Sequence, residues 1–331
     1  MLCRTLNKDV YAAVKIGRKL SEDFKLEKGL RQGDAIAPLL FNIVLEIAIR
    51  KASIQTKGTI FNKCNQIIAY ADDLVLLGRR QKDVSETFGA LVEQTSKLGL
   101  QINEGKTKYM VMSRNQHPQN KIKIENYSFE IQNKFIYLGT SLTSNNDISA
   151  DIETRIASAN RADFTLRPIL KSQIVHRNTK LRIYKSLIRP IVTYLAETWI
   201  MYAHITKRLA VFERKVLRKI LGPIKVNGEW RIRTNSELMQ LYKDLDIVAY
   251  MKIMRLKWIG HVNRMEEERV PYQVFVNQPE GRRQRGRPKT RWWDDMYNDI
   301  RKCKITRWNI RSKDRDDWRR SLEEAKVRIG L

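Results

Sequence analysis

The chain has 331 residues, of which 42% are apolar, and this is long enough for two or three domains with cores of their own. Its 63 Lys and Arg outnumber 36 Asp and Glu, and the formal net charge of +27 favours a polyanionic partner. The three cysteines are far apart, and the longest apolar run, "AIAPLLFNIVLEIAI", contains Asn42 and Glu46. Composition therefore excludes a disulfide-rich scaffold and a membrane-spanning chain, and the absence of an apolar signal segment predicts an intracellular protein that is not secreted.

Positive charge and aromatic residues are concentrated in the second half. Residues 1–150 hold 22 basic and 15 acidic side chains, whereas residues 151–331 hold 41 and 21, a net charge of +20. All seven tryptophans also lie there: Trp199, Trp230, Trp258, Trp292, Trp293, Trp308 and Trp318. This composition suits contacts with phosphates and unstacked bases, although any one tryptophan is as readily a core residue and any one charge a solvated helix face.

The first half is predicted to be an α+β unit, because helical and strand-like apolar patterns alternate. The predicted elements are a buried helix within residues 34–52 with Pro38 in its first turn, a hairpin of strands 67–70 and 74–77, a helix near 82–98, a strand at 106–113, and a strand or hairpin at 129–142.

The second half is predicted to be mostly helical, since its apolar residues recur at helical spacing. The predicted helical segments are 151–166, 178–200, 205–222, 236–265 and two short Trp-bearing helices near 290–302 and 314–328. The dipeptide Gly222-Pro223 marks a break after the third of these segments.

Two adjacent aspartates, Asp72 and Asp73, interrupt the apolar segment "IIAYADDLVLLG" at the expected tip of the first hairpin. Two buried carboxylates without a counter-ion would be costly, whereas at a hairpin tip they can bind a divalent cation above packed strands. The alternative is that both are ordinary turn residues, since Asp is common in turns. The pair by itself leaves both interpretations open.

Four motifs in chain order resolve this question: "GLRQGDAIAPLLFNIVLE", "YADDLVLLG", "GLQINEGKTKYM" and "KFIYLGTSLT". Together they resemble the reverse transcriptase of non-LTR (LINE-type) retrotransposons, and the helical remainder is similar to the region that follows the polymerase in insect elements. The resemblance implies partial fingers and a partial polymerase palm, an antiparallel sheet with helices, in residues 1–143. It further implies a thumb-like helical bundle in residues 144–222 and a basic helical region in residues 223–331, with an Arg-rich loop at 280–291.

The resemblance also implies roles for matching residues. Asp72 and Asp73 would be the metal-binding carboxylates of a two-ion Mg²⁺ site, Tyr70 would lie beside the primer end, and Lys106 would neutralise or protonate pyrophosphate. Lys106 could equally be a solvated lysine at a strand edge.

Two further segments match motifs that hold nucleotide and primer. The segment near the template and incoming nucleotide comprises Arg31, Gln32 and Gly33. Two nearby positions depart from the family pattern: Ala37 replaces the usual Ser before Pro38, and Ala35 stands where Pro is common. The hairpin resembling the primer grip contains Phe135, Tyr137, Leu138 and Gly139.

The loop "GRRQRGRPK" carries five cationic side chains: Arg282, Arg283, Arg285, Arg287 and Lys289. Its Arg-Gly-Arg-Pro core resembles an AT-hook, in which arginines enter a narrow minor groove. A solvated basic linker is the alternative, and we expect this loop to contact phosphates.

The pattern FxDxxKAFD, which supplies the first catalytic aspartate in the family, is absent, and the acids before Gly33 are Asp9, Glu22, Asp23 and Glu27. We therefore expect the chain to begin downstream of that strand, and the metal site to be incomplete. The expected function is an RNA-directed DNA polymerase fragment, inactive alone, with an RNA template, a DNA primer, dNTP and metal as ligands, no other small-molecule cofactor and no membrane. A nuclear or nucleus-associated location follows from these partners. The alternative is a non-catalytic, basic nucleic-acid-binding remnant.

Because cationic side chains that neutralise phosphates release counterions, we predict that binding of RNA or DNA by this chain weakens steeply with salt. The affinity should fall by roughly tenfold or more between about 50 and 200 mM salt, as measured by fluorescence anisotropy. An affinity that stays constant across the series would contradict the assignment of a polyanionic partner.

Overall fold

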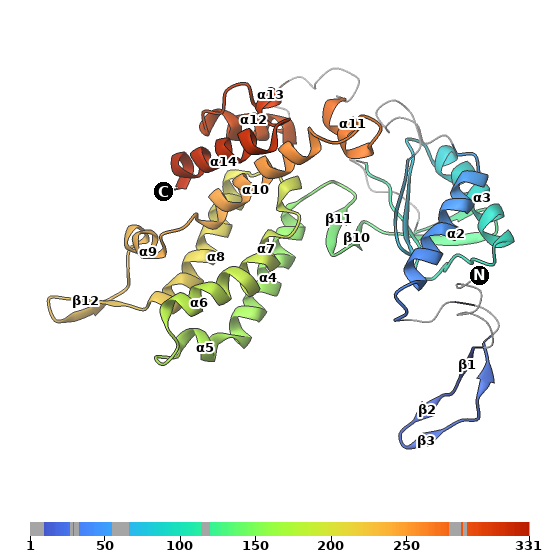
Figure 1. Cartoon of the computed structure of the whole chain (residues 1–331), viewed down its shortest axis with the longest axis horizontal. Coiled ribbons are helices and arrows are strands. Elements are labelled where there is room, and N and C mark those ends of the chain that lie inside the picture. Colours follow the sequence, from blue (N-terminus) through green and yellow to red (C-terminus); the bar gives the residue numbers. More distant parts are fainter. Residues whose placement is uncertain are drawn as a thin grey trace. The chain divides into compact units, whose positions relative to one another are not determined.

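A computed structural model describes residues 10–26, 29, 33–54, 66–113, 120–277, 286 and 290–330. Helices occur together with small, mostly antiparallel sheets, so the expected α+β class is confirmed (Figure 1). The chain divides into two compact units, Met1–Ile102 and Asn103–Leu331, and each is described by itself. The three-part division at residues 143 and 222 stays a prediction.

The first unit contains two helices, a hairpin and a β-arm. Its described elements are β1 (Tyr11–Ala12), β2 (Lys15–Ile16), β3 (Lys19–Leu20), β4 (Phe24–Lys25), α2 (Ala37–Lys51), β5 (Gln66–Tyr70), β6 (Asp73–Leu77) and α3 (Gln81–Lys97). The arm consists of β1 paired with β4 and β2 paired with β3, and it was not predicted. The two helices and the β5–β6 hairpin were predicted.

Helix α2 begins as predicted, with Pro38 in its first turn, where a missing N–H leaves no hydrogen bond unmade. It packs against α3 and buries Leu45 and Ala48. The predicted burial of this helix holds for one face only, because Leu39 and Ile43 are 61% and 48% exposed. Its residues are apolar around most of the helix, and that pattern cannot tell which faces meet another element.

The second unit starts with two small sheets. Their strands are β7 (Lys108–Tyr109), β8 (Lys121–Ile124), β9 (Tyr127–Ile131), β10 (Lys134–Tyr137) and β11 (Thr140–Thr143). The order β7-β9-β8 forms a three-stranded sheet, in which β7 is parallel to β9, and β10 pairs with β11 as a hairpin. The strand predicted at 106–113 is reduced to two residues, because it pairs over only that length with β9.

A helical bundle follows the sheets. Its elements are α4 (Ser149–Thr165), α5 (Arg167–Lys171), α6 (Arg177–Ile183), the π-helix η2 (Tyr184–Ile188), α7 (Arg189–Thr193), the 3₁₀ turn η3 (Ala196–Thr198) and α8 (Ala203–Leu221). The single segment predicted at 178–200 is therefore interrupted. Pro190 lacks an N–H and follows the π-turn, and Leu195 adopts a left-handed conformation with φ of 58°, so the α-helix cannot continue.

The C-terminal part of this unit consists of a hairpin and six helices in the described residues. They are β12 (Ile224–Val226), β13 (Glu229–Arg231), α9 (Asn235–Tyr242), α10 (Ile247–Val262), α11 (Val270–Val276), α12 (Trp292–Lys302), α13 (Trp308–Arg311) and α14 (Arg315–Gly330). The single helix predicted at 236–265 is wrong. Lys243 is left-handed and ends α9, and the Asp246 side chain accepts from the Ala249 N–H at 2.7 Å to begin α10.

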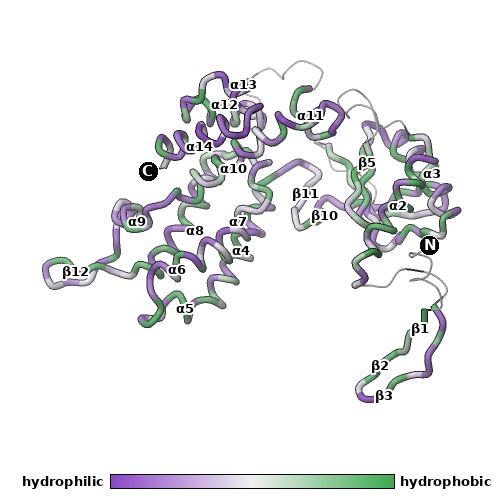
Figure 2. Tube along the Cα trace, viewed as in Figure 1, coloured by the Kyte–Doolittle hydropathy of each residue, from purple (hydrophilic) through white to green (hydrophobic). Residues whose placement is uncertain are grey.

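Two apolar cores hold the second unit together, and α10 contributes to both. Ile247 and Met251 belong to the core of the bundle, whereas Ile253 and Leu256 belong to the core formed with α12 and α14. Along α8, which lies in the bundle core, apolar and charged residues alternate with the helical repeat (Figure 2). Among the described residues, no helix combines the length and the apolar character needed to cross a membrane.

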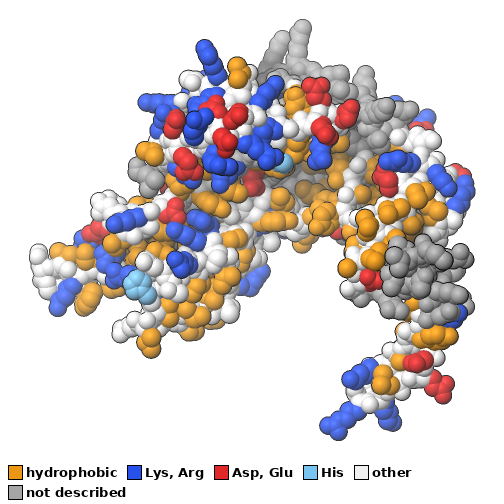
Figure 3. All heavy atoms as spheres, viewed as in Figure 1, with side chains coloured by type: hydrophobic (Ala, Val, Ile, Leu, Met, Phe, Trp, Pro, Cys, Tyr) orange, Lys and Arg blue, Asp and Glu red, His pale blue; other side chains and the backbone are white. Residues whose placement is uncertain are grey.

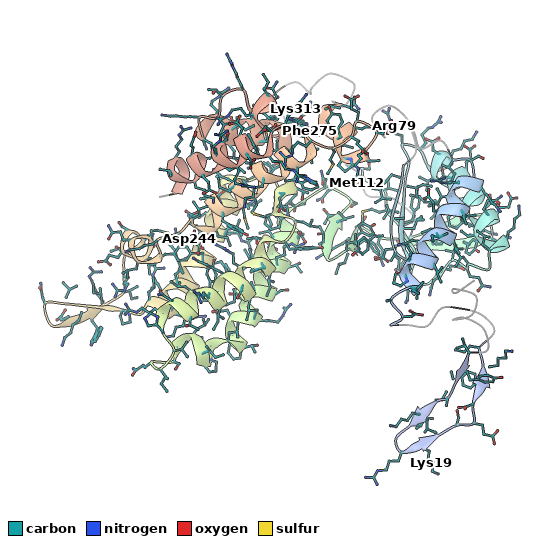
Figure 4. The ribbon with its side chains drawn as sticks, viewed as in Figure 1. Lys19, Arg79, Met112, Asp244, Phe275 and Lys313 are labelled. Carbon is teal, nitrogen blue, oxygen red and sulfur yellow. The ribbon has the colours of Figure 1, made fainter. Side chains whose placement is uncertain are left out.

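The tryptophans have different environments, so neither interpretation of them holds for all. Trp199 and Trp318 are 2% and 3% exposed, whereas Trp230 is 69% exposed. The indole N–H of Trp318 donates to the Leu256 carbonyl at 3.1 Å, and its ring lies where a Cβ on Gly260 would be, so only glycine allows this contact. Figure 4 labels Phe275 of α11, which packs against the rings of Trp293 and Trp308.

One carboxyl group lies inside the bundle core. Glu213 of α8 is 1% exposed and accepts hydrogen bonds of 2.8 Å from the Tyr184 hydroxyl and from the Ile247 N–H. Burial raises the pKa of Glu213 to about 7, because desolvation disfavours the charged form. The group joins η2, α8 and the start of α10.

The pKa of Glu213 predicts a pH dependence of stability. Because its folded-state pKa of about 7 exceeds its ordinary value of 4.5, the folded state binds more protons between these pH values. The stabilising contribution of protonated Glu213 is therefore fully present below about pH 4.5. The free energy of unfolding then falls by about 3 kcal/mol as the pH rises through 7. Glu213→Gln should lack this loss in urea denaturation at several pH values.

The matched control is Glu153→Gln, since the side chain of Glu153 is 54% exposed in α4. This variant should keep the pH dependence of the original chain. An unchanged pH profile in Glu213→Gln would show that Glu213 is not the titrating group.

Candidate active site

The β5–β6 hairpin carries the aspartate pair, as predicted. Tyr70 pairs with Asp73 at the last position of the ladder, so Ala71 and Asp72 form the connecting turn. Both aspartates and Tyr70 are exposed, and Tyr70 is 67% exposed. Strand β6 is half-buried and lies against α3, whereas Ile68 of β5 is 41% exposed. The expectation of packed apolar strands beneath the aspartates therefore holds for one strand.

The turn between the two strands is strained. Ala71 has φ of 52°, in the left-handed region, where the Cβ of an L-residue costs roughly 1–2 kcal/mol. Such residues persist where the surroundings require them, and they cluster at functional sites. Here the strained residue directly precedes Asp72, so it helps to set the direction of the two carboxylates.

The donor chemistry of this turn fits a hard divalent cation. Magnesium prefers carboxylate oxygens, and Asp72 and Asp73 present four of them to solvent on one turn. Within the part of the chain that the structure describes, no group of three or more His, Cys, Asp or Glu side chains could hold a metal ion. Asp72 and Asp73 are two carboxylates, one fewer than such a group needs.

The predicted nucleotide-binding turn is described only at Gly33. Arg31 and Gln32 lie outside the described residues. Gly33 has φ of 92°, and a Cβ there would meet no atom within 4 Å, so conformation rather than crowding requires glycine. Helix α2 starts four residues later.

Lys106 belongs to the second unit, whereas the aspartates belong to the first. It is exposed in the turn Glu104–Lys106, and its backbone N–H donates to the Asn103 side-chain oxygen at 3.0 Å. Lys108, in β7, is the lysine that forms an ion pair, with Glu130 at 2.6 Å. The role predicted for Lys106 stays a prediction.

The hairpin resembling a primer grip forms as predicted. Phe135 pairs with Leu142 and Tyr137 with Thr140, and the turn is Leu138-Gly139 with φ of 45° and 77°. Two positive φ values are the requirement of the tight hairpin turn that matches strand twist. The turn is exposed, so its backbone is accessible to a ligand.

Helix α4 fastens this hairpin to the bundle through Arg155, which sequence reasoning missed. The Arg155 guanidinium donates from Nη2 to the Gly139 carbonyl at 3.1 Å and to the Thr140 hydroxyl at 3.0 Å. Its Nε donates to Asp151 Oδ2 at 2.8 Å, and Asp151 Oδ1 accepts from the Ser141 N–H at 2.9 Å. Both side chains are buried, so the β10–β11 turn is held by a desolvated ion pair.

Tyr194, after α7, completes the attachment. Its hydroxyl donates to the Leu138 carbonyl at 3.2 Å, and the Arg155 guanidinium lies 4.9 Å from its ring centroid. A cavity of about 110 Å³ lies beside the turn, lined by Gly139, Ser141 and Arg155 among others. In sequence, Asp151 and Arg155 have the (i, i+4) spacing of an ordinary surface pair, and only their burial sets them apart.

Of the Arg-rich loop at 280–291, the structure describes Gly286, Thr290 and Arg291. The placements of Arg282, Arg283, Arg285, Arg287 and Lys289 are therefore untested, and their binding role stays a prediction. On the face that Figure 3 presents, Lys and Arg side chains are frequent on the C-terminal helices, with acidic side chains among them.

Comparison with known proteins adds three relatives and a family. Residues 2–142 match the family described as reverse transcriptase (RNA-dependent DNA polymerase). An uncharacterised transposon-derived protein of Caenorhabditis elegans is 25% identical over 261 residues, which cover 76% of this chain and 92% of that protein. The match therefore covers nearly the whole length of the Caenorhabditis elegans protein.

The other two relatives are Pol polyproteins of R2 retrotransposable elements. The Drosophila melanogaster type-2 protein is 24% identical over 204 residues, covering 54% of this chain and 19% of the polyprotein. The Popillia japonica type-1 protein is 29% identical over 100 residues, covering 30% of this chain and 16% of the polyprotein. The chain therefore matches about a fifth or less of the length of these two polyproteins.

The buried pair Asp151–Arg155 yields a prediction on stability. Asp151→Asn leaves the buried guanidinium without a countercharge, and we expect the free energy of unfolding to fall by about 3–5 kcal/mol in urea denaturation. Removing both partners with Asp151→Leu and Arg155→Met should destabilise by less than the sum of the two single changes.

The control is the exposed pair Glu153–Arg208, which joins α4 to α8 with side chains 54% and 47% exposed. Glu153→Gln should change the free energy of unfolding by less than about 1 kcal/mol. Equal effects at the buried and exposed pairs would contradict the attachment role of Arg155.

Proposed function

We propose that this chain is the part of an RNA-directed DNA polymerase that binds metal and primer, because residues 2–142 match the reverse transcriptase family and two relatives are Pol polyproteins of R2 retrotransposable elements. The observation that carries the proposal is the exposed pair Asp72–Asp73 on a strained turn at the tip of β5–β6. The attached, exposed turn of β10–β11 supports the primer-holding part.

In this proposal Asp72 and Asp73 ligate Mg²⁺. Bound cations would activate the primer 3′ hydroxyl and stabilise the leaving pyrophosphate in two-metal nucleotidyl transfer. The exposed backbone of Leu138-Gly139 binds the primer end, and Arg155 keeps that backbone fixed to α4. The resemblance of its motif to that of the family is the support for Lys106 as a cationic acid for pyrophosphate.

We further propose that this site is incomplete in the present chain. Two neighbouring carboxylates cannot by themselves hold two cations in line with the reacting groups, and no acid before Gly33 occurs in the family's first-aspartate pattern. The RNA template and the DNA primer would be its partners, and a nuclear or nucleus-associated location would follow, which imaging of the tagged chain would test.

The second candidate is a nucleic-acid-binding protein without catalysis. The net charge of +20 in residues 151–331 favours it, since this charge needs no metal site to act. The two candidates differ in whether Asp72 matters to the function.

Primer extension on an RNA template separates them. We predict no extension by the chain alone with magnesium, and templated synthesis when the fingers and first-aspartate strand of an intact relative are fused ahead of Met1. Asp72→Ala should then abolish synthesis, because it removes a metal ligand. The matched control is Glu125→Ala, an exposed acidic residue in the turn of the β8–β9 hairpin, which should leave synthesis intact.

Two results would contradict this proposal. Extension by the unmodified chain that is sensitive to Asp72→Ala would show a complete metal site. Synthesis by the fusion that survives Asp72→Ala would make the aspartates ordinary turn residues and favour the second candidate.

A further inference from the structure

The β12–β13 hairpin is a preformed, solvent-exposed ribbon that no sequence motif singled out. Its turn, Asn227-Gly228, has φ of 50° and 87°, the two positive values of the tightest hairpin turn. Every residue from Lys225 to Ile232 is exposed. Figure 1 shows the hairpin projecting from the bundle beyond α8.

An aromatic ring and an ammonium group share one face of this ribbon. Trp230 is directly opposite Lys225 in the strand register, and cross-strand partners lie on the same side of a sheet. Trp230 is 69% exposed, and Lys225 forms no ion pair with any residue that the structure describes. Both groups are therefore available to a ligand.

The opposite face holds the ribbon in place. Arg231 alternates with Trp230 and so lies on the other side, where its two terminal nitrogens donate to Glu237 of α9 at 2.6 and 2.9 Å. The Glu237 carboxylate also accepts from the Thr234 N–H in the capping box of α9. The base of the hairpin is thus tied to a helix, while the Trp230 face stays open.

The exposure of Trp230 indicates that this side chain contacts a binding partner. A tryptophan contributes to folding by burying a large apolar area, and a two-stranded ribbon offers little surface for this. The charge near the hairpin indicates which partner: residues 223–234 contain Lys225, Arg231 and Arg233 against Glu229, and with Arg231 paired to Glu237, Lys225 and Arg233 remain. An anionic ligand with flat, unpaired rings fits both features.

We propose that the β12–β13 hairpin binds single-stranded nucleic acid, with an unpaired base stacked on Trp230 and the adjoining phosphate contacted by Lys225. A duplex does not fit, because its base faces are already stacked on one another. The inference rests on the proposed function only in that the chain binds nucleic acid. It does not depend on the metal site.

The test measures anisotropy of labelled single-stranded RNA and DNA of one sequence with the full chain. Trp230→Ala should weaken binding by about 5- to 100-fold, the usual effect of losing one stacked base, and Trp230→Phe should retain most of it. The matched control is Ile232→Ala, because Ile232 is 74% exposed next to the hairpin and should have no effect. Comparison of the RNA and DNA arms identifies whether the sugar contributes.

An oligonucleotide without bases separates stacking from folding. Trp230→Ala should not change the affinity for this oligonucleotide. Lys225→Ala should weaken the binding of both oligonucleotides, and it should reduce the slope of log affinity against log salt by about the value of one phosphate contact. Equal losses for Trp230→Ala on both oligonucleotides would overturn stacking.

Unchanged affinity of Trp230→Ala for the intact strand would also overturn the proposal. If Trp230→Ala instead abolished a concentration-dependent self-association of the chain, the hairpin would be a protein interface. Absence of nucleic-acid binding by the unmodified chain would overturn the proposed function as well, so the two failures are distinguishable.

Discussion

Buried charge is the constraint on which the second unit depends, because a charge removed from water must find a partner. Arg255 of α10 is 1% exposed, and its guanidinium donates to Asp299, to Asp295 at 2.7 Å and to the Trp199 carbonyl at 3.0 Å. These contacts join α10, α12 and the segment before α8. Asp163 of α4 pairs in the same way with Lys219 of α8. The buried aspartates Asp151, Asp163 and Asp299 of the described residues therefore each lie where two elements meet.

The same rule explains how the β10–β11 turn acquires a fixed position in this chain. The β10–β11 turn is exposed, and a free two-stranded hairpin is only marginally stable in water. Arg155 and Asp151 form hydrogen bonds from α4 with the backbone of Gly139 and Ser141, so the hairpin is attached to the bundle. The Asp72 turn differs, since its strain at Ala71 is local and its carboxylates face solvent.

In the proposed binding of nucleic acid, the net positive charge and the exposed aromatic group would act by different physics. Charge acts on phosphates at long range and is screened by salt, whereas stacking needs an unpaired base within contact distance. The buried tryptophans take no part in this. Trp199 and Trp318 hold helices together, and the exposed Trp230 remains for recognition.

The sequence by itself determined the family resemblance, the α+β class, the β5–β6 and β10–β11 hairpins and the start of α2, because these depend on local patterns of apolar residues, turns and Pro38. The Asn227-Gly228 turn was also readable, and it would have predicted β12–β13. Tertiary structure alone decided the rest. Asp151 and Arg155 have the spacing of any helical surface pair, and α10 is apolar on faces that enter two different cores. Which side chains lose contact with water depends on residues far away in the chain, and no local pattern contains that information.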